Sequence, residues 1–217
     1  MNATIARRKT RNRPWTYVVA IILFLFLAYN SVYIKKLDEV KAAGSAGTGK
    51  FDAATYAKTF WNTKLIPSAA GGAVDLSTLL SLLKTDKDKA FTTYSQALGI
   101  GNIRYFLVKG EGTVTAVSDN DVTLSLPSGE TIRLATEYIF GNAARDASGL
   151  IKITEFDNTT DLNNVSAAIN DIIRKDVIPP LKAAAKPGKK IAFVGAIELN
   201  RAHLHLDDIE VIPISAR

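Results

Sequence analysis

Two histidines and two aspartates lie close together near the end of the chain, in the segment HLHLDD at residues 203–208. We expect this segment to open a strand over about residues 203–214, where alternate side chains share one face. His203, His205 and Asp207 would then converge, and imidazole and carboxylate groups are ligands that suit zinc or a similar ion. The segment is therefore a candidate metal site. A polar strand face without a metal is the alternative.

A second candidate site pairs a cation with an anion in the segment GNAARD, where Arg145 is followed by Asp146. The two groups could form a salt bridge that holds a loop, and we favour this interpretation. Alternatively, the planar donors of Arg145 could bind an anionic or hydroxyl-rich ligand. Trp61 could stack on a sugar or a base, but its place in a regular apolar helical stripe favours core packing. These three residues are the candidates for ligand binding.

Motifs of the common enzyme classes are absent from the 217 residues. There is no Gly-x-Ser-x-Gly elbow, phosphate-binding loop, HExxH motif or dinucleotide fingerprint. The sequence also lacks cysteine, which excludes disulfides, thiolate metal sites, a cysteine nucleophile and a lipid-modified cysteine within these residues. We therefore expect a protein that is not an enzyme and carries no cofactor. A hydrolase or other enzyme is the alternative, with its site on the face of a predicted β-barrel.

The net charge of +6 comes almost wholly from a basic cluster near the N-terminus. Five Lys or Arg residues lie at positions 7–13, ahead of an apolar stretch, and every acidic residue follows that stretch. Removing these five from the 27 basic residues leaves 22, against 21 acidic ones. A nucleic-acid-binding face needs Lys and Arg gathered on the folded domain. We therefore expect no nucleic-acid partner.

The apolar stretch Trp15–Ile34 is long enough to cross a bilayer. Its 20 residues, at about 1.5 Å each in a helix, cover roughly 30 Å, the thickness of the hydrocarbon core. The positive charges ahead of it should keep the N-terminus in the cytoplasm. We expect a single-pass inner-membrane protein with a cytoplasmic tail (1–14), a signal-anchor helix (15–34), a flexible linker (35–50) and a periplasmic domain (51–217). A cleaved signal peptide and a buried core helix are the alternatives.

Three helices are expected at the start of the folded domain. The first two begin with an aspartate that can serve as N-cap, Asp52 and Asp75, and the third begins at about Asp86. Apolar residues recur with helical spacing after the first two caps. Pro67 should end the first helix, and the third should run to about Leu98.

The pattern then changes to the alternation of strands. Three strands are expected over about residues 106–116, 122–126 and 132–134, as a meander joined by two tight turns. Phe106, Val108, Val114 and Ala116 should share one face of the first strand. That strand contains two glycines, which often mark a bulge or a bend.

The remaining elements suggest the fold. We expect a further strand at about residues 151–156, a helix from Asp161 that stops before Pro179, and strands at about 190–199 and 203–214. The order of three strands, a helix and two strands matches a five-stranded Greek-key barrel of the OB type. The predicted class is therefore α+β, an OB-like barrel with an inserted helix and N-terminal helical additions. A plain antiparallel α+β sandwich is the alternative.

Four segments carry a resemblance to known proteins: Phe51–Pro67, Val108–Val114, Gly141–Ala147 and Lys189–Leu199. The chain resembles the predicted periplasmic lipoproteins of unknown function, a bacterial family often encoded beside sugar ABC-transporter genes. The resemblance implies an extracytoplasmic, OB-like domain with helical additions, and it supplies no activity and no catalytic residue. The sequence departs from the lipoprotein pattern because it has no cysteine to acylate.

The expected function follows from the anchor, the missing enzyme motifs and the resemblance. We expect an accessory or ligand-binding module at the outer face of the cytoplasmic membrane, held there by residues 15–34 and linked to sugar ABC transport. Its expected partner is a transporter component or a solute-binding protein. An assembly scaffold for a membrane complex is a further alternative.

Overall fold

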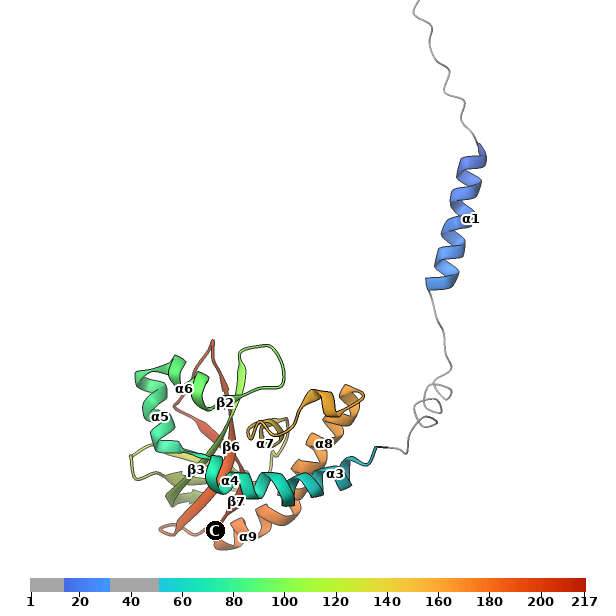
Figure 1. Ribbon diagram of the computed structural model, residues 1–217. Helices are drawn as coiled ribbons and strands as arrows, with labels where there is room; N and C mark the ends of the chain where they lie inside the picture. The colour runs from blue at the N-terminus through green and yellow to red at the C-terminus, as the bar shows by residue number, and fades with distance from the viewer. Residues whose placement is uncertain (1–13, 32–50) are drawn as a thin grey trace, which may run out of the picture. The chain divides into compact units, whose positions relative to one another are not determined.

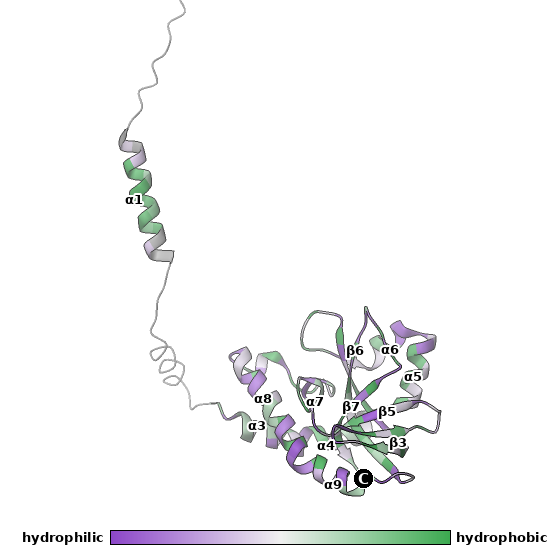
Figure 2. Ribbon diagram, turned by 180° about the vertical axis from the view of Figure 1, so that it is seen from behind, coloured by the Kyte–Doolittle hydropathy of each residue, from purple (hydrophilic) through white to green (hydrophobic). Residues whose placement is uncertain are grey.

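The computed structural model describes residues 14–31 and 51–217, which belong to two compact units that divide between Lys50 and Phe51. In the first unit, helix α1 (Pro14–Ser31) exposes mostly apolar side chains, and the middle of its ribbon is green in Figure 2, the colour of hydrophobic residues. None of the helices in these two ranges is both long and apolar enough to cross a membrane. The predicted linker, the tail up to residue 13 and residues 32–34 of the predicted anchor lie outside the described residues.

The second unit is built on a closed five-stranded barrel (Figure 1). Its strands are β3 (Ile103–Val117), β4 (Asp121–Ser125), β5 (Thr131–Ala135), β6 (Lys190–Asn200) and β7 (Ile209–Ala216). The sheet runs in the order β3, β4, β5, β7, β6 and closes where β6 pairs with β3; the β5–β7 pair is parallel, and the other pairs are antiparallel. This topology confirms the predicted OB-type Greek key, and the sandwich alternative is wrong.

Two short strands extend the first barrel strand. β1 (Val74–Asp75) pairs with β3 in parallel, and β2 (Ser95–Gln96) pairs with it in antiparallel orientation. Helices α5 (Leu76–Thr85) and α6 (Lys87–Tyr94) lie between them in the sequence. The side chain of Asp75 accepts a backbone N–H group, as predicted for an N-cap, and the side chain of Asp86 does the same at the start of α6. The apolar stripe of α5 is fully buried, which fixes this helix on the barrel.

We predicted that the first helix of the domain ends at Pro67, and this prediction is wrong because the helix continues past it. It runs through α3 (Ala53–Phe60), a π-helical turn (Trp61–Leu65) and α4 (Ile66–Gly72). Proline lacks a backbone N–H and clashes with the preceding turn of a regular α-helix. The wider π turn just before Pro67 relieves that conflict, so the helix continues.

The helix inserted between β5 and β6 also has a π-helical turn just before its prolines. It consists of α8 (Thr159–Ile172), a π-helical turn (Ile173–Val177) and α9 (Ile178–Ala184), and it passes through the prolines at which we expected it to stop. Its N-cap is Asn158, whose side chain accepts the backbone N–H of Asp161, so Asp161 is not the cap. Helix α8 packs against α3, as Figure 1 shows.

Two predicted strand segments are wrong. Residues 151–156 contain a short 3-10 turn, because Glu155 accepts the backbone N–H of Lys152 and the hydroxyl of Tyr56. The last strand begins at Ile209 instead of residue 203, because Asn200 ends β6 by accepting two backbone N–H groups of the following loop.

Two smaller expectations also fail. The helix that begins after Asp86 ends at Tyr94, because the chain then enters β2 and pairs with β3. Ala116 does not share the buried face of Val114. A bulge between these two residues in the β3–β4 pairing turns Ala116 toward solvent.

Candidate functional site

A cleft of about 560 Å³ opens between the β6–β7 loop and the segment that follows β5. We call it the histidine-loop cleft. Its floor is apolar and is formed mainly by Ile197 and Leu199 of β6 and Ile209 and Ile212 of β7, all of them buried. The cleft falls within the ~300–1,000 Å³ range that small-molecule sites occupy. Apolar floors with a few polar groups at the rim are typical of such sites.

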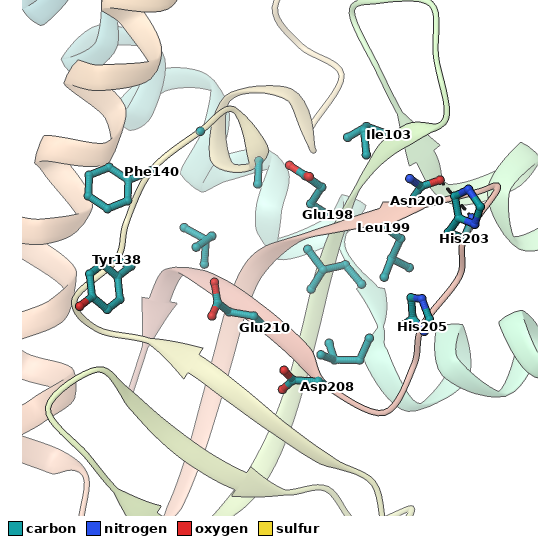
Figure 3. Close-up of a pocket in the computed structure, with 15 residues that line it drawn as sticks. Ile103, Tyr138, Phe140, Glu198, Leu199, Asn200, His203, His205, Asp208 and Glu210 are labelled. Atoms are coloured by element: carbon teal, nitrogen blue, oxygen red, sulfur yellow. Dashed lines mark hydrogen bonds between the residues drawn. The ribbon is translucent and has the colours of Figure 1, made fainter.

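The polar and aromatic side chains of the cleft lie at its two ends and in its middle (Figure 3). Tyr138 and Phe140 lie at one end, His203 and His205 lie at the other, and Glu198 lies between them. The carboxylates of Asp208 and Glu210 also line the middle of the cleft. Strands β6 and β7 therefore supply the floor together with Glu198 and Glu210, and loops supply Asp208 and the two ends.

The predicted metal site is not assembled. His203 and His205 line the cleft from an exposed loop, and Asp207 is not among the lining residues. The argument from a shared strand face is wrong because residues 201–208 form no strand. In the described ranges, no group of three or more His, Cys, Asp or Glu side chains is placed to hold a metal ion.

Arg133 ties the β6–β7 loop to the barrel. Its Nε and Nη2 atoms each donate a hydrogen bond of 2.7 Å to the carboxylate of Asp208. Asp121 and Glu210 lie farther from the guanidinium, at 3.6 and 3.8 Å. The hydrogen bond with Asp208, together with the nearby acidic charges, raises the pKa of Arg133. The loop that carries the histidines is thus held in place by β5.

Arg145 and Asp146 form a buried salt bridge, the interpretation that we favoured. Both residues are 4% exposed and belong to the short helix α7 (Ala143–Asp146). The two contacts between guanidinium and carboxylate measure 2.5 and 2.9 Å, and Arg145 Nη1 also donates to the carbonyl oxygen of Leu162 at 3.3 Å. The pair therefore joins α7 to α8. Trp61 is buried in the core on its π turn.

The segment after β5 exposes two aromatic rings on a fixed backbone. We call residues 137–142 the aromatic loop. Tyr138 and Phe140 are 61% and 67% exposed, whereas Ile139 between them is fully buried. Sequence reasoning missed these residues, which lie in the segment EYIFGN.

Three side chains of the inserted helix hold the aromatic loop from behind. Arg174 donates to the carbonyl oxygen of Ile139 and lies 5.9 Å from the centre of the Phe140 ring. Asn170 donates to the carbonyl oxygen of Gly141 at 3.0 Å, and the hydroxyl of Ser166 donates to the side chain of Asn142. The π turn of the inserted helix carries Arg174. The backbone that carries the two exposed rings is therefore held in place.

The barrel topology and the cleft at its surface define an OB-fold protein with a candidate site for a small ligand. Residues 22–216 match the model of the family described as Predicted periplasmic lipoprotein (DUF2291), and the chain belongs to this family. The resemblance read from the sequence is thereby confirmed. The family description places its members outside the cytoplasm and in association with a membrane.

Among solved structures, the chain is similar to an OB-fold protein from Thermotoga maritima. The two share 23% sequence identity with a TM-score of 0.68, and the match covers 77% of this chain and 98% of the other. At this identity the likeness shows the fold alone. None of the curated proteins matches the chain.

Proposed function

We propose that the protein is a membrane-tethered, non-enzymatic module of the periplasm that binds a small solute in the histidine-loop cleft and assists a sugar ABC transporter. The observation that carries this proposal is the cleft itself, because it combines an apolar floor with polar groups that converge from strands and loops. Membership of a periplasmic lipoprotein family supports the location.

The lining of the cleft favours binding over catalysis. In the described part of the chain, no serine, threonine or lysine lines it, so nucleophiles of these three types are missing there. Asp207 lies outside the lining, which leaves His203 and His205 without the third ligand of the predicted metal site. A hydrolytic activity that disappears in His205→Ala would support the enzyme alternative instead.

The charge of the cleft favours a solute that is not a nucleic acid. Glu198, Asp208 and Glu210 line it, and carboxylates repel the phosphates that dominate nucleic-acid binding. This agrees with the near-neutral composition of the domain.

We propose that residues 15–34 tether the domain as a single-pass signal anchor. Helix α1 covers residues 15–31 of this stretch, and the sequence continues with Val32, Tyr33 and Ile34. The basic residues at positions 7–13 support a cytoplasmic N-terminus. Such a tether raises the effective concentration of the domain near membrane partners, which gives an anchored module an advantage over a soluble one.

Membranes that contain the C-terminally tagged full chain should keep it through a carbonate wash, because a spanning helix resists extraction. After solubilisation in detergent, the tag should recover a transporter component or a solute-binding protein. The matched control replaces residues 1–34 with a cleavable signal peptide, and this variant should appear in the soluble wash. Release of the unmodified chain by carbonate would contradict the anchor, and recovery of no transport protein above background would contradict the partner.

A further inference from the structure

The aromatic loop presents two rings at one end of the cleft. The ring centres of Tyr138 and Phe140 are 6.4 Å apart, with the planes tilted by 35°. Because Arg174 lines a separate hollow behind the loop and not the cleft, its contact with Phe140 supports the ring from outside the cleft. Exposed aromatic side chains on a fixed backbone lose little conformational freedom when a ligand binds. They are suited to an apolar or cationic group.

The charge of the cleft is negative, and only part of it is compensated. Arg133 binds both oxygens of Asp208 and lies 3.8 Å from Glu210. Glu198 makes no ion pair with any of the described residues. In Figure 3, Glu198 lies between Phe140 at one end of the cleft and Asn200 at the other. One free carboxylate therefore shares a cleft with two aromatic rings and an apolar floor.

We infer that the histidine-loop cleft binds a small organic cation with an apolar body, such as a quaternary ammonium compound. The inference rests on the proposed function, since it names the class of solute that the cleft takes. Aromatic faces attract cations through their quadrupole, and this is the usual way in which proteins recognise quaternary ammonium groups. Glu198 supplies the opposite charge, and the floor around Ile197 and Leu199 accepts the methyl groups. An anion would be repelled by the carboxylates of Glu198, Asp208 and Glu210 along the lining.

Calorimetric titration of the full chain in detergent with choline tests this inference. The matched ligand is the uncharged carbon isostere of choline, in which a tert-butyl group replaces the trimethylammonium group. Both ligands have the same shape, so any difference reports charge. Choline should bind about tenfold more tightly than the isostere, because the cation gains both the aromatic and the carboxylate interaction.

Two variants should show which side chains give choline its higher affinity. Glu198→Gln should weaken choline binding about threefold and leave the isostere unchanged, and replacing Tyr138 and Phe140 together with leucine should weaken choline about fivefold. The control is Glu111→Gln, which removes an exposed carboxylate of β3 that does not line the cleft, and it should bind choline as the unmodified chain does.

Three outcomes would overturn the inference. Equal affinity for choline and its isostere would leave the cleft as a solute site but remove the cation. If choline binding is unchanged in Glu198→Gln and in the leucine variant, the cation does not bind at Glu198 and the two aromatic rings. Absence of choline binding, combined with binding of a neutral sugar in the cleft, would refute the cation and leave the proposed function intact.

Discussion

Replacing Arg145 with alanine is expected to lower the free energy of unfolding by about 3–5 kcal/mol, because it leaves the carboxylate of Asp146 buried without a partner. Asp146 is only 4% exposed, and its contacts with Arg145 at 2.5 and 2.9 Å are the ion-pair contacts that it makes among the described residues. Since domains are stable by about 5–15 kcal/mol, the loss removes a large share of the total. Urea unfolding followed by circular dichroism measures it.

A second arginine–carboxylate pair, which is exposed to solvent, serves as the control for this prediction. Arg133 and Asp208 form a pair with the same two-pronged geometry, but their side chains are 34% and 71% exposed. Arg133→Ala should therefore cost only about 1 kcal/mol or less. Replacing both Arg145 and Asp146 with apolar residues of similar size should restore most of the stability lost in Arg145→Ala. Equal costs for the two arginine variants would contradict the assignment of Arg145 as a buried structural residue.

Gly195→Ala is expected to destabilise the barrel by about 3 kcal/mol, at the upper end of the usual cost of overpacking. A β-carbon at this position would lie 2.4 Å from Val211 Cγ1 and 2.7 Å from the carbonyl oxygen of Ile212. The second contact is with backbone, which a change of side-chain rotamer cannot relieve. Gly195 also lies at the bulge where the register of β6 and β7 shifts. Thermal and urea unfolding of the variant measure the effect.

Gly72→Ala is the matched control for that substitution. Gly72 ends helix α4, and an added β-carbon there meets nothing within 4 Å. This change should leave the protein unaltered or stabilise it by up to about 1 kcal/mol, since alanine is the better helix former. If both glycine variants unfold at the same urea concentration, the close packing between β6 and β7 is not a determinant of stability.

The barrel strands could be predicted best where a strand alternates along its own sequence. β4 and β5 bury every second residue and are separated by tight turns, so their signal is local. The ends of the long helices could not be predicted in the same way. Proline ends a regular α-helix, but the π turns at Trp61–Leu65 and Ile173–Val177 let both helices continue. Nothing in the sequence pattern indicates such a turn.

The candidate site could be predicted only in part. The sequence drew attention to His203 and His205, which do line the cleft, but for the wrong reason, because they lie on a loop and not on a strand face. Tyr138, Phe140 and Glu198 were missed because they meet only through the barrel closure and the support of the inserted helix. The pairing of Arg133 with a residue 75 positions away is likewise a product of the fold.

The central claim is that the histidine-loop cleft is the solute site, and methyl NMR of the full chain in detergent tests it most directly. Ile103, Ile197 and Leu199 report on the cleft, and Leu79 and Leu80 of α5 report on the core away from it. The probes are glucose, choline and inorganic phosphate, added separately. We predict that glucose or choline shifts the cleft methyl signals, that the α5 signals stay in place, and that phosphate changes neither set. Shifts confined to methyl groups outside the cleft, or no shift with any of the three probes, would contradict the claim.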